Sequence, residues 1–529
     1  MVNKMFKKIM AILIVAILLV TTFVGCSDDE ETYLACGVSQ MPRYFDPQVA
    51  STTSEKIVAV NIFDGLFKLD EKGEPQKCIV KDYKISPDGL TYTFYLKENM
   101  KYYISGEAKD FLEEKGKTVE ARVTARDFVF GIERAILPET NSEAYGSLSI
   151  IKNAEKVHNG EASVDELGIK AIGDYTLEIT LEEKSSDFLY VLSQPGAFPC
   201  DEEFFNITEG RYGLDEEYII SNGCFYLSDI KDGESVRFSK SEEYAGDFGT
   251  TVTSVRLHVN ASEKDNAKKV DDGTYHIGFF AGEEAIEELG RKTNKTDIEN
   301  ITTALAFNMN KPALQNTKLR IGLVSSIDIK AVTGADYKNL VPSGYKLSGG
   351  CVERASYNIA VARKNMISAF EELEIDNLTI SVLCTTDNEE MAKAIVNCWQ
   401  SNIGVELNGK VVVAENDDDY EAKIRAGEYS IVICDLTVDS GKASDFLSVF
   451  MTGNNFFGYS SEEYDRMVAD LNKNSTKEKA ALCESYLLKN AVAVPLGYKN
   501  TILAVAKDTV GVYSAGDRAN IYFYKGILE

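Results

Sequence analysis

The chain has 529 residues, of which 83 are acidic and 56 are basic, and its formal net charge at pH 7 is −27. Hydrophobic residues make up 44% and charged residues 26%, a balance typical of a folded globular protein, and the length predicts about two to four domains. The acidity argues against a nucleic-acid-binding protein, because such proteins need a basic surface to neutralise phosphates. The histidines, His158, His258 and His276, are too widely spaced to favour a histidine-rich metal centre.

The first residues predict export from the cell. Three lysines precede residues 9–20, a run of 12 apolar residues. A transmembrane helix needs about 20 apolar residues, so this basic start with a short apolar run is typical of a secretory signal. Cys26 follows Gly25, as in a bacterial lipoprotein signal, whose cysteine is acylated after cleavage. We therefore expect residues 1–25 to be a signal peptide and Cys26 the lipidation site on the outer face of the membrane. An uncleaved anchor with an incidental cysteine is the alternative.

The pattern of the remaining chain predicts a large mixed α/β protein. Strands are predicted at 33–38, hairpin-type segments at 61–69 and 89–96, and an amphipathic helix at 125–136 with Thr124 as its N-cap. Further strands are expected at 177–181, 223–227, 235–239 and 254–259. After residue 260 helices (318–329, 388–401, 462–471) alternate with strands (378–383, 404–407, 429–434, 501–505). No linker or repeat divides the sequence, so we expect interwoven domains with a cleft.

The sequence offers little for catalysis or metal binding. Nine cysteines follow Cys26, an odd number without a CxxC pair, so most are predicted to be small buried side chains rather than zinc ligands or a disulfide framework. No nucleophile-elbow, P-loop or dinucleotide-binding motif occurs. The run Asp417-Asp418-Asp419 is expected to be a solvated loop rather than a catalytic pair. We expect no cofactor and no enzymatic activity.

Several short motifs occur in a recognisable order. They are Phe45-Asp46-Pro47, Asn61-Ile62-Phe63-Asp64-Gly65-Leu66, Ser86-Pro87-Asp88-Gly89, Thr124-Ala125-Arg126-Asp127-Phe128, Leu167-Gly168-Ile169, Ser221-Asn222-Gly223, Glu243-Tyr244, Phe307-Asn308, Leu319-Arg320, Ile327-Asp328, Tyr429, Asp439, Phe446-Leu447 and Val494-Pro495-Leu496. Together they resemble the extracellular solute-binding proteins of family 5, most closely the oligopeptide-binding lipoproteins of ABC transporters. The resemblance covers about residues 33–529.

The resemblance implies a two-lobed fold of the periplasmic-binding-protein type (type II), with an additional domain inserted in lobe one. Lobe one would comprise residues 26–62, 174–260 and 496–529, the inserted domain 63–173, and lobe two 261–495. An extended peptide would lie in the cleft between the lobes, paired through its backbone. Closure on the peptide would present the receptor to permease and ATPase subunits of the transporter. We expect the receptor to be a monomer.

The resemblance also implies individual binding residues. Asp439 falls where relatives place an aspartate that holds the α-ammonium of the peptide; an exposed loop acid is the alternative. Met41 and Arg43 flank Pro42 in the segment whose backbone pairs with the ligand, although a proline cannot donate a hydrogen bond. Tyr145 falls near a tyrosine that reaches the ligand from the inserted domain, an ordinary packed tyrosine being the alternative.

Several positions depart from the family pattern. Leu436 replaces an expected tryptophan, Ile433 replaces a basic residue that can meet the peptide carboxylate, and the turn after Asp439 reads Ser440-Gly441-Lys442-Ala443. Arg425 is a candidate substitute for the missing basic residue, whereas Trp399 is expected to pack on its own helix. These departures leave other cargoes open, such as a nickel chelate, a sugar or a signalling peptide. A surface lipoprotein that does not transport, or an extracellular hydrolase, is a further alternative.

Overall fold

A computed structural model describes residues 33–185, 187–350, 352–404, 406–438, 441–473, 475–515 and 519–528. Two of the predicted functional residues, Cys26 and Asp439, lie outside these ranges. In the described part of the chain no helix has the length and apolarity needed to span a bilayer.

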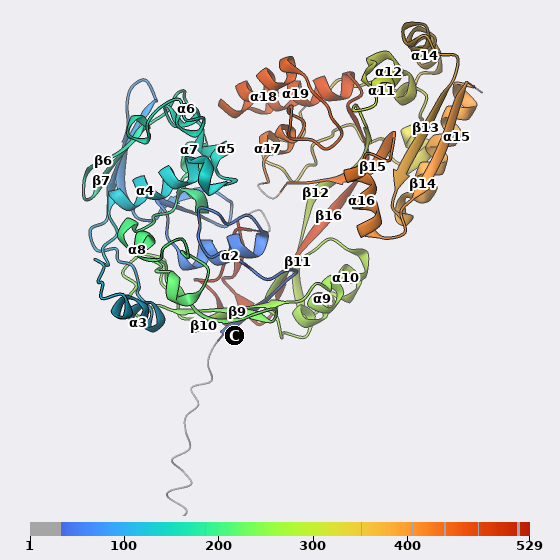
Figure 1. The fold of residues 1–529 in the computed structure, drawn as a ribbon. Coiled ribbons are helices and arrows are strands. Elements are labelled where there is room, and N and C mark those ends of the chain that lie inside the picture. Colours follow the sequence, from blue (N-terminus) through green and yellow to red (C-terminus); the bar gives the residue numbers. More distant parts are fainter. Residues whose placement is uncertain are drawn as a thin grey trace, which may run out of the picture.

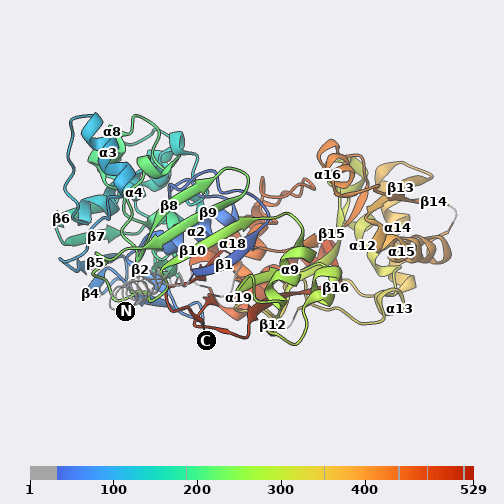
Figure 2. The same ribbon diagram turned by 90° about the horizontal axis from the view of Figure 1, so that it is seen from below.

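The molecule has two lobes that share one long mixed sheet, which is the two-lobed α/β fold that the resemblance implied (Figure 1). In spatial order the ten strands are β14 (Leu407–Val413), β13 (Leu378–Cys384), β15 (Ile431–Leu436), β12 (Thr293–Phe307), β16 (Ala493–Ala506), β11 (Ile277–Phe280), β1 (Tyr33–Val38), β10 (Ser254–Val259), β9 (Ser235–Lys240) and β8 (Phe225–Lys231). We call the part around β1 and β8 to β10 lobe one, and the part around β13 to β15 lobe two. Seen from below, β8, β9, β10 and β1 run side by side in lobe one (Figure 2).

The antiparallel ribbon of β12 and β16 joins the lobes (Figure 1). Its register runs from Thr293↔Ala506 to Ala306↔Ala493 and shifts at two places, between Glu299 and Ile301 and between Thr303 and Ala304. Each shift interrupts the regular ladder and bends the strand locally. The first half of β12 is polar and pairs with β16. The apolar second half, from Thr302 to Phe307, also pairs with β15 in lobe two.

Lobe one also carries a second sheet with its own core. The four strands are β4 (Val80–Ile85), β5 (Thr91–Leu96), β7 (Thr176–Thr180) and β6 (Ile169–Gly173). The helices of lobe one are α2 (Thr53–Ile62), α3 (Gly106–Glu114), α4 (Ala125–Ile136), α5 (Tyr145–Leu148), α6 (Ala154–His158), α7 (Phe188–Val191) and α8 (Glu202–Ile207). Helix α9 (Glu263–Asp271) packs beside β11, and α10 (Glu283–Glu288) packs against α9. Short strand pairs are β2 (Phe67–Leu69) with β3 (Pro75–Lys77), β17 (Thr509–Val510) with β20 (Ile527–Leu528), and β18 (Tyr513–Ser514) with β19 (Ile521–Tyr522). The residue boundaries of the lobes and of the inserted domain stay a prediction.

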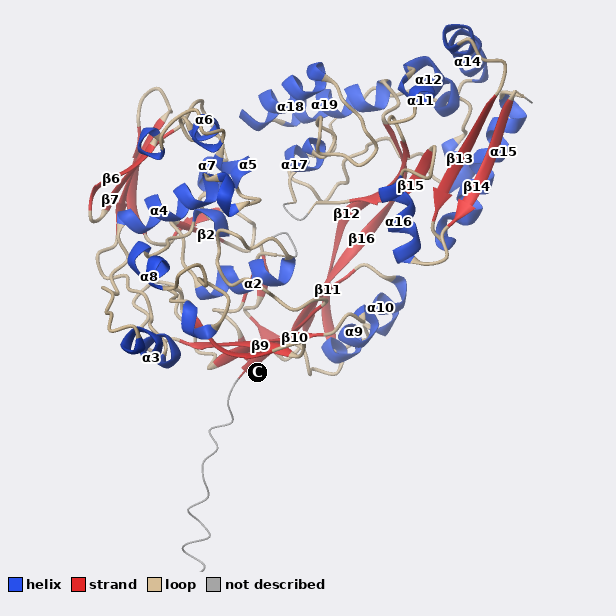
Figure 3. Cartoon of the chain, viewed as in Figure 1, coloured by secondary structure: helices blue, strands red, loops and turns tan. Residues whose placement is uncertain are grey.

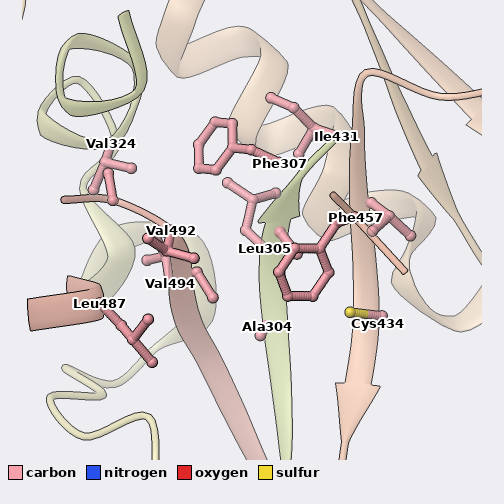
Figure 4. Close-up of a cluster of buried hydrophobic side chains, with 14 of the residues drawn as sticks. Ala304, Leu305, Phe307, Val324, Ile431, Cys434, Phe457, Leu487, Val492 and Val494 are labelled. Atoms are coloured by element: carbon pink, nitrogen blue, oxygen red, sulfur yellow. The ribbon is translucent and has the colours of Figure 1, made fainter. Parts of the chain in front are cut away.

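Lobe two is built on one apolar core that includes both faces of its sheet. Its helices are α11 (Pro312–Gln315), α12 (Thr317–Ser325), α13 (Ile329–Thr333), α14 (Ile359–Leu373), α15 (Glu389–Asn402), α16 (Asp417–Ala426), α17 (Ala443–Ser448), α18 (Glu462–Lys473) and α19 (Lys477–Lys489). Leu305 and Phe307 of β12 pack with Ile431 of β15 and Val494 of β16 (Figure 4). The helices α17, α18 and α19 lie on the side of lobe two that faces lobe one (Figure 3).

Local sequence signals predicted several elements correctly. The strands at 33–38 and 254–259 have the predicted bounds, and so does the helix at 125–136, where the N–H of the N-cap Thr124 donates to Asp127 at 2.6 Å. Trp399, on α15, is fully buried in the core of lobe two and donates its indole N–H to the carbonyl of Leu323 on α12 at 3.1 Å. Seven of the eight described cysteines after Cys26 are buried, and all eight are free thiols, as predicted for small apolar side chains.

Other predicted elements were misplaced. Residues 61–62 end helix α2 instead of beginning a hairpin, because α2 is buried on nearly all sides and shows no apolar periodicity. The helix predicted at 318–329 ends at Ser325, and Asp328 caps a separate helix. The strand predicted at 404–407 begins only at Leu407, after Gly404 turns the chain at a φ of 126°. The aspartate run at 417–419 opens α16 rather than forming a loop.

Candidate functional site

Lobe one presents a cavity where β1 and β10 end. The two strands are parallel and in register from Tyr33↔Ser254 to Val38↔Val259, so the segments that follow them leave the sheet at the same edge. A cavity of about 130 Å³ lies there, lined among others by Ser39, Gln40, Thr53 and Asn260. The buried Oδ1 of Asn266, which also lines the cavity, accepts no hydrogen bond, while its Nδ2 donates to Asn260 at 2.9 Å. This end of lobe one therefore offers polar groups next to the predicted ligand-binding segment.

The predicted segment at Met41 and Arg43 is braced by the N-terminus of α2. Both Arg43 and Tyr44 donate their backbone N–H to Oε1 of Glu55 at 3.2 Å, and Glu55 also closes the capping box of α2 with Thr52. Burial alone would raise the pKa of Glu55, but the backbone hydrogen bonds from Thr52, Ser51 and Arg43 lower it overall. Met41 is half-buried against the core of lobe one, and the Arg43 side chain is exposed. Since Pro42 has no N–H and that of Arg43 is engaged, the N–H of Met41 is the donor left in this tripeptide.

Tyr145 lies on the short helix α5 and is held by a ring stack. Its ring lies parallel to that of His158 on α6, with centroids 3.7 Å apart and planes 13° apart. The Nδ1 of His158 lies 2.7 Å from the carbonyl oxygen of Ile136. Burial raises the pKa of the Tyr145 hydroxyl. The stack fixes the ring within lobe one, and a contact of Tyr145 with a ligand stays a prediction.

The two binding residues predicted in lobe two lie on different elements, Leu436 on β15 and Arg425 on α16. Leu436 ends β15 opposite Thr302 and is 6% exposed, within the core of this lobe. Arg425 lies on the exposed side of α16, where its guanidinium is 3.5 Å from Oε2 of Glu421. Leu436 thus packs in the core of lobe two, and a cargo contact of Leu436 or of Arg425 stays a prediction.

The loop after β15 is fixed to the ribbon by Tyr345. The hydroxyl of Tyr345 donates to the carbonyl oxygen of Asn300 at 2.8 Å and accepts the N–H of Val438 at 2.9 Å. The N–H of the neighbouring Gly344 donates to the carbonyl oxygen of Glu299 at 2.8 Å. These bonds attach the loop to β12 where its register with β16 shifts.

Two lysines of lobe two reach across to lobe one, and sequence reasoning assigned neither of them a role. The ammonium of Lys442 lies 3.1 Å from Oδ2 of Asp187 and 3.4 Å from the ring centroid of Tyr190, at the start of α7. The ammonium of Lys346 lies 2.9 Å from Oε1 of Glu74. Lys346 and Lys442 form a parallel bridge, so both belong to one small unit. The one sequence signal was the departure from the family pattern at residues 440–443.

In the described ranges no group of three His, Cys, Asp or Glu side chains is placed to hold a metal ion. The cysteines there are free, and burial raises the pKa of the Cys36 and Cys434 thiols to about 12. Such thiols are protonated at neutral pH and are poor nucleophiles.

Comparison with known proteins places the chain among binding proteins. The family profile described as "Bacterial extracellular solute-binding proteins, family 5 Middle" matches residues 74–458, more than half of the chain. The dipeptide-binding protein DppE of Bacillus subtilis is 23% identical over 87% of this chain and 86% of its own length. The dipeptide-binding protein of Lactococcus lactis is 26% identical over 84% of each chain.

Solved structures show the same fold. The substrate-binding domain of an oligopeptide ABC transporter from Bacillus anthracis superposes with a TM-score of 0.70 at 22% identity, over 94% of this chain and 99% of that one. OppA of Listeria monocytogenes bound to peptide matches with a TM-score of 0.70 at 21% identity, over 94% and 99% of the two chains. The chain belongs to the bacterial extracellular solute-binding proteins of family 5.

Proposed function

We propose that this chain is the substrate-binding receptor of an ABC importer, which binds oligopeptides between its lobes and delivers them to the permease and ATPase subunits. The observation that carries the proposal is that the loop after β15 reaches lobe one, since Lys442 contacts Asp187 and Tyr190. Groups of both lobes are thereby available to one ligand, and membership of the family supports a role in binding rather than catalysis. Relatives named as dipeptide- and oligopeptide-binding proteins favour a peptide as the cargo.

Asp439 is proposed as the group that holds the α-ammonium of the peptide. Its chain neighbours support this role, because Val438 is fixed to the ribbon by Tyr345 and Lys442 contacts lobe one. A carboxylate that takes an ammonium out of water must compensate the lost hydration of that charge. Tyr145 and the segment of Met41 and Arg43 are proposed to complete the site from lobe one, and Leu436 and Arg425 from lobe two.

Peptide binding is tested by native mass spectrometry of the protein purified from its own cells, followed by calorimetric titration. We expect co-purified peptides, and we expect Asp439→Asn to weaken binding of a free-amine peptide by about 100-fold, which corresponds to about 2.7 kcal/mol. An N-acetylated peptide should be affected much less. Asp445→Asn, in the first turn of α17, is the matched control and should leave both affinities unchanged. A co-purified metal chelate or sugar, or an equal effect on both peptides, contradicts the proposal.

Lipid anchoring at Cys26 is part of the proposal. Outside the cytoplasm an acylated receptor stays beside its transporter, whereas an unanchored one diffuses away. The wild-type protein should partition into the detergent phase of a Triton X-114 extraction, and Cys26→Ser should partition into the aqueous phase. Mass spectrometry of the mature N-terminus should find the acyl groups on Cys26. An unmodified Cys26 in a mature chain would refute this anchor.

A further inference from the structure

The ammonium of Lys442 is bound by two groups of the opposite lobe. Its distances of 3.1 Å to the Asp187 carboxylate and 3.4 Å to the Tyr190 ring centroid satisfy an ion pair and a cation–π contact at once. The Lys442 side chain is 12% exposed and that of Asp187 is 35% exposed. Both contacts are therefore partly removed from water. An aromatic face and a carboxylate attract a cation more strongly in such a site than in water.

The receiving pair is built into lobe one. Asp187 is the N-cap of α7 and Tyr190 follows within its only turn, so the two side chains are presented by one rigid element. Phe188, between them, is fully buried in the core below the four-stranded sheet. Tyr190 itself packs against the core around β1. The backbone that carries the carboxylate and the ring is thus anchored in the cores of lobe one.

A second lysine shows which feature of this pair is unusual. Lys68 also meets a carboxylate and aromatic rings, with its ammonium 2.8 Å from Asp64 and 5.4 Å from the ring centroid of Tyr522. Lys68 is 3% exposed and all of its partners belong to lobe one, so this cation is a permanent part of the core. The cation at Asp187 and Tyr190 comes instead from the other lobe and can leave without any element unfolding.

We propose that Asp187 and Tyr190 form a subsite for a cationic side chain of the cargo, and that Lys442 occupies this subsite while the cleft is empty. The inference rests on the proposed peptide-binding function. The ligand class is a primary ammonium, as in a lysine side chain, because that group already fits the two contacts in this structure. When such a cargo binds, its ammonium replaces that of Lys442, and the charge balance at Asp187 is unchanged.

The resident lysine sets how strongly the subsite discriminates. An internal group that fills a site reduces the apparent affinity of any ligand for it by the fraction of molecules in which the site is free. Removing Lys442 therefore frees the subsite for cargo, while removing Asp187 or Tyr190 abolishes the preference for a cation. Lys346 offers a matched control, because it crosses to lobe one in the same unit but contacts Glu74 instead of the pair.

The test compares twin peptides by isothermal titration calorimetry with the mature protein. The twins have the same length and a free α-amine, and they differ only in carrying lysine or Nε-acetyl-lysine at one position, which is scanned along the peptide. At one position the wild-type protein should prefer the lysine twin by about 10-fold, and Asp187→Asn and Tyr190→Leu should each reduce this ratio towards one. Lys442→Met should raise affinity for the lysine twin several-fold more than for its acetylated partner, and Lys346→Met should leave the ratio unchanged.

The outcomes separate the subsite from the proposed function. If the twins bind but no scanned position gives a ratio that Asp187→Asn and Tyr190→Leu reduce, the subsite is refuted while peptide binding stands. If neither twin binds the wild-type protein at any position, the proposed function itself fails. A correctly folded state of each variant is checked by circular dichroism, and Asp187→Asn leaves α7 without any loss of capping, because the Asp187 side chain makes no cap hydrogen bond there.

Discussion

Arg134 of helix α4 forms a buried ion pair with Asp46, which follows the predicted ligand-binding segment. Its Nη2 lies 2.5 Å from Oδ2 of Asp46, and its Nη1 donates to Oε1 of Gln48 at 2.9 Å. The guanidinium also lies over the ring of Phe205 at 4.1 Å. Arg134 and Asp46 are 8% and 3% exposed, so neither charge is well hydrated. We expect Arg134→Met to be among the more damaging single substitutions in lobe one.

The magnitude follows from what the substitution leaves behind. Methionine occupies a similar volume, but the Asp46 carboxylate then stays buried without its cation, which costs about 3–5 kcal/mol. Adding Asp46→Asn removes that charge, so the double variant loses mainly the hydrogen bond to Gln48 and the contact with Phe205. That loss amounts to about 1–3 kcal/mol. The two substitutions should therefore be coupled by at least about 2 kcal/mol, with the double variant more stable than Arg134→Met.

Urea unfolding of the two single variants and the double variant measures this coupling. Circular dichroism follows the whole chain, whereas fluorescence of the single tryptophan, Trp399, follows lobe two alone. A loss confined to the circular dichroism transition would mean that the lobes unfold separately. Lys393→Met, on the exposed face of α15, is the control and should change neither transition. Additive effects of Arg134→Met and Asp46→Asn would refute the reasoning, because a buried pair cannot be energetically independent.

Three further predictions concern the cores and the response to pH. Burial raises the pKa of Asp127 from 3.8 to about 7, so the folded state holds a proton that the unfolded chain has lost between about pH 4 and pH 7. The free energy of unfolding should fall across that window by up to about 4 kcal/mol, at about 1.4 kcal/mol per pKa unit, and Asp127→Asn should flatten the decline. Gly131→Ala should lower the melting temperature despite the better helix propensity of alanine, because its Cβ would lie 2.4 Å from the carbonyl oxygen of Phe198. Arg320→Met should cost more than about 3 kcal/mol in urea unfolding, since it strips buried carbonyl oxygens of Leu314, Asn490 and Ala491 of their donor, whereas full stability of that variant would contradict this role.

Local signals were sufficient where an element carries its own cap and its own periodicity. The helix at 125–136 has both, with Thr124 and Asp127 at its start and a buried face of Phe128, Ile132 and Ala135. The two-lobed fold was predicted by the order of short motifs along the chain, which no single element could supply. By contrast, residues 293–300 of β12 are mostly polar and do not alternate, so their strand follows from pairing with β16, which lies more than 200 residues later in the chain.

The candidate site was harder to predict, because its contacts join residues that are distant in sequence. Lys442 and Asp187 are 255 residues apart, and neither lies in a motif that would indicate a partner. Arg43 was predicted as a ligand-binding position, but its backbone N–H is engaged by Glu55, whose position at the third residue of α2 becomes visible only with the helix. Leu436 was singled out as a missing tryptophan, and the structure shows its side chain in the core of lobe two.

The attachment of the loop after β15 links cargo binding to lobe movement on the proposed function. Tyr345 and Gly344 fix this loop to Asn300 and Glu299, where the register of β12 with β16 shifts. A ladder bends most easily where its regular bonds are interrupted, so bending of the ribbon there moves the loop together with lobe two. A ligand shifts such an equilibrium only by its difference in affinity for the two arrangements. The contact of Lys442 with Asp187 already favours one arrangement of the lobes without cargo. Because a cargo ammonium replaces that of Lys442 and so removes this contact, the cargo shifts the equilibrium further only if its own contacts across the lobes are stronger.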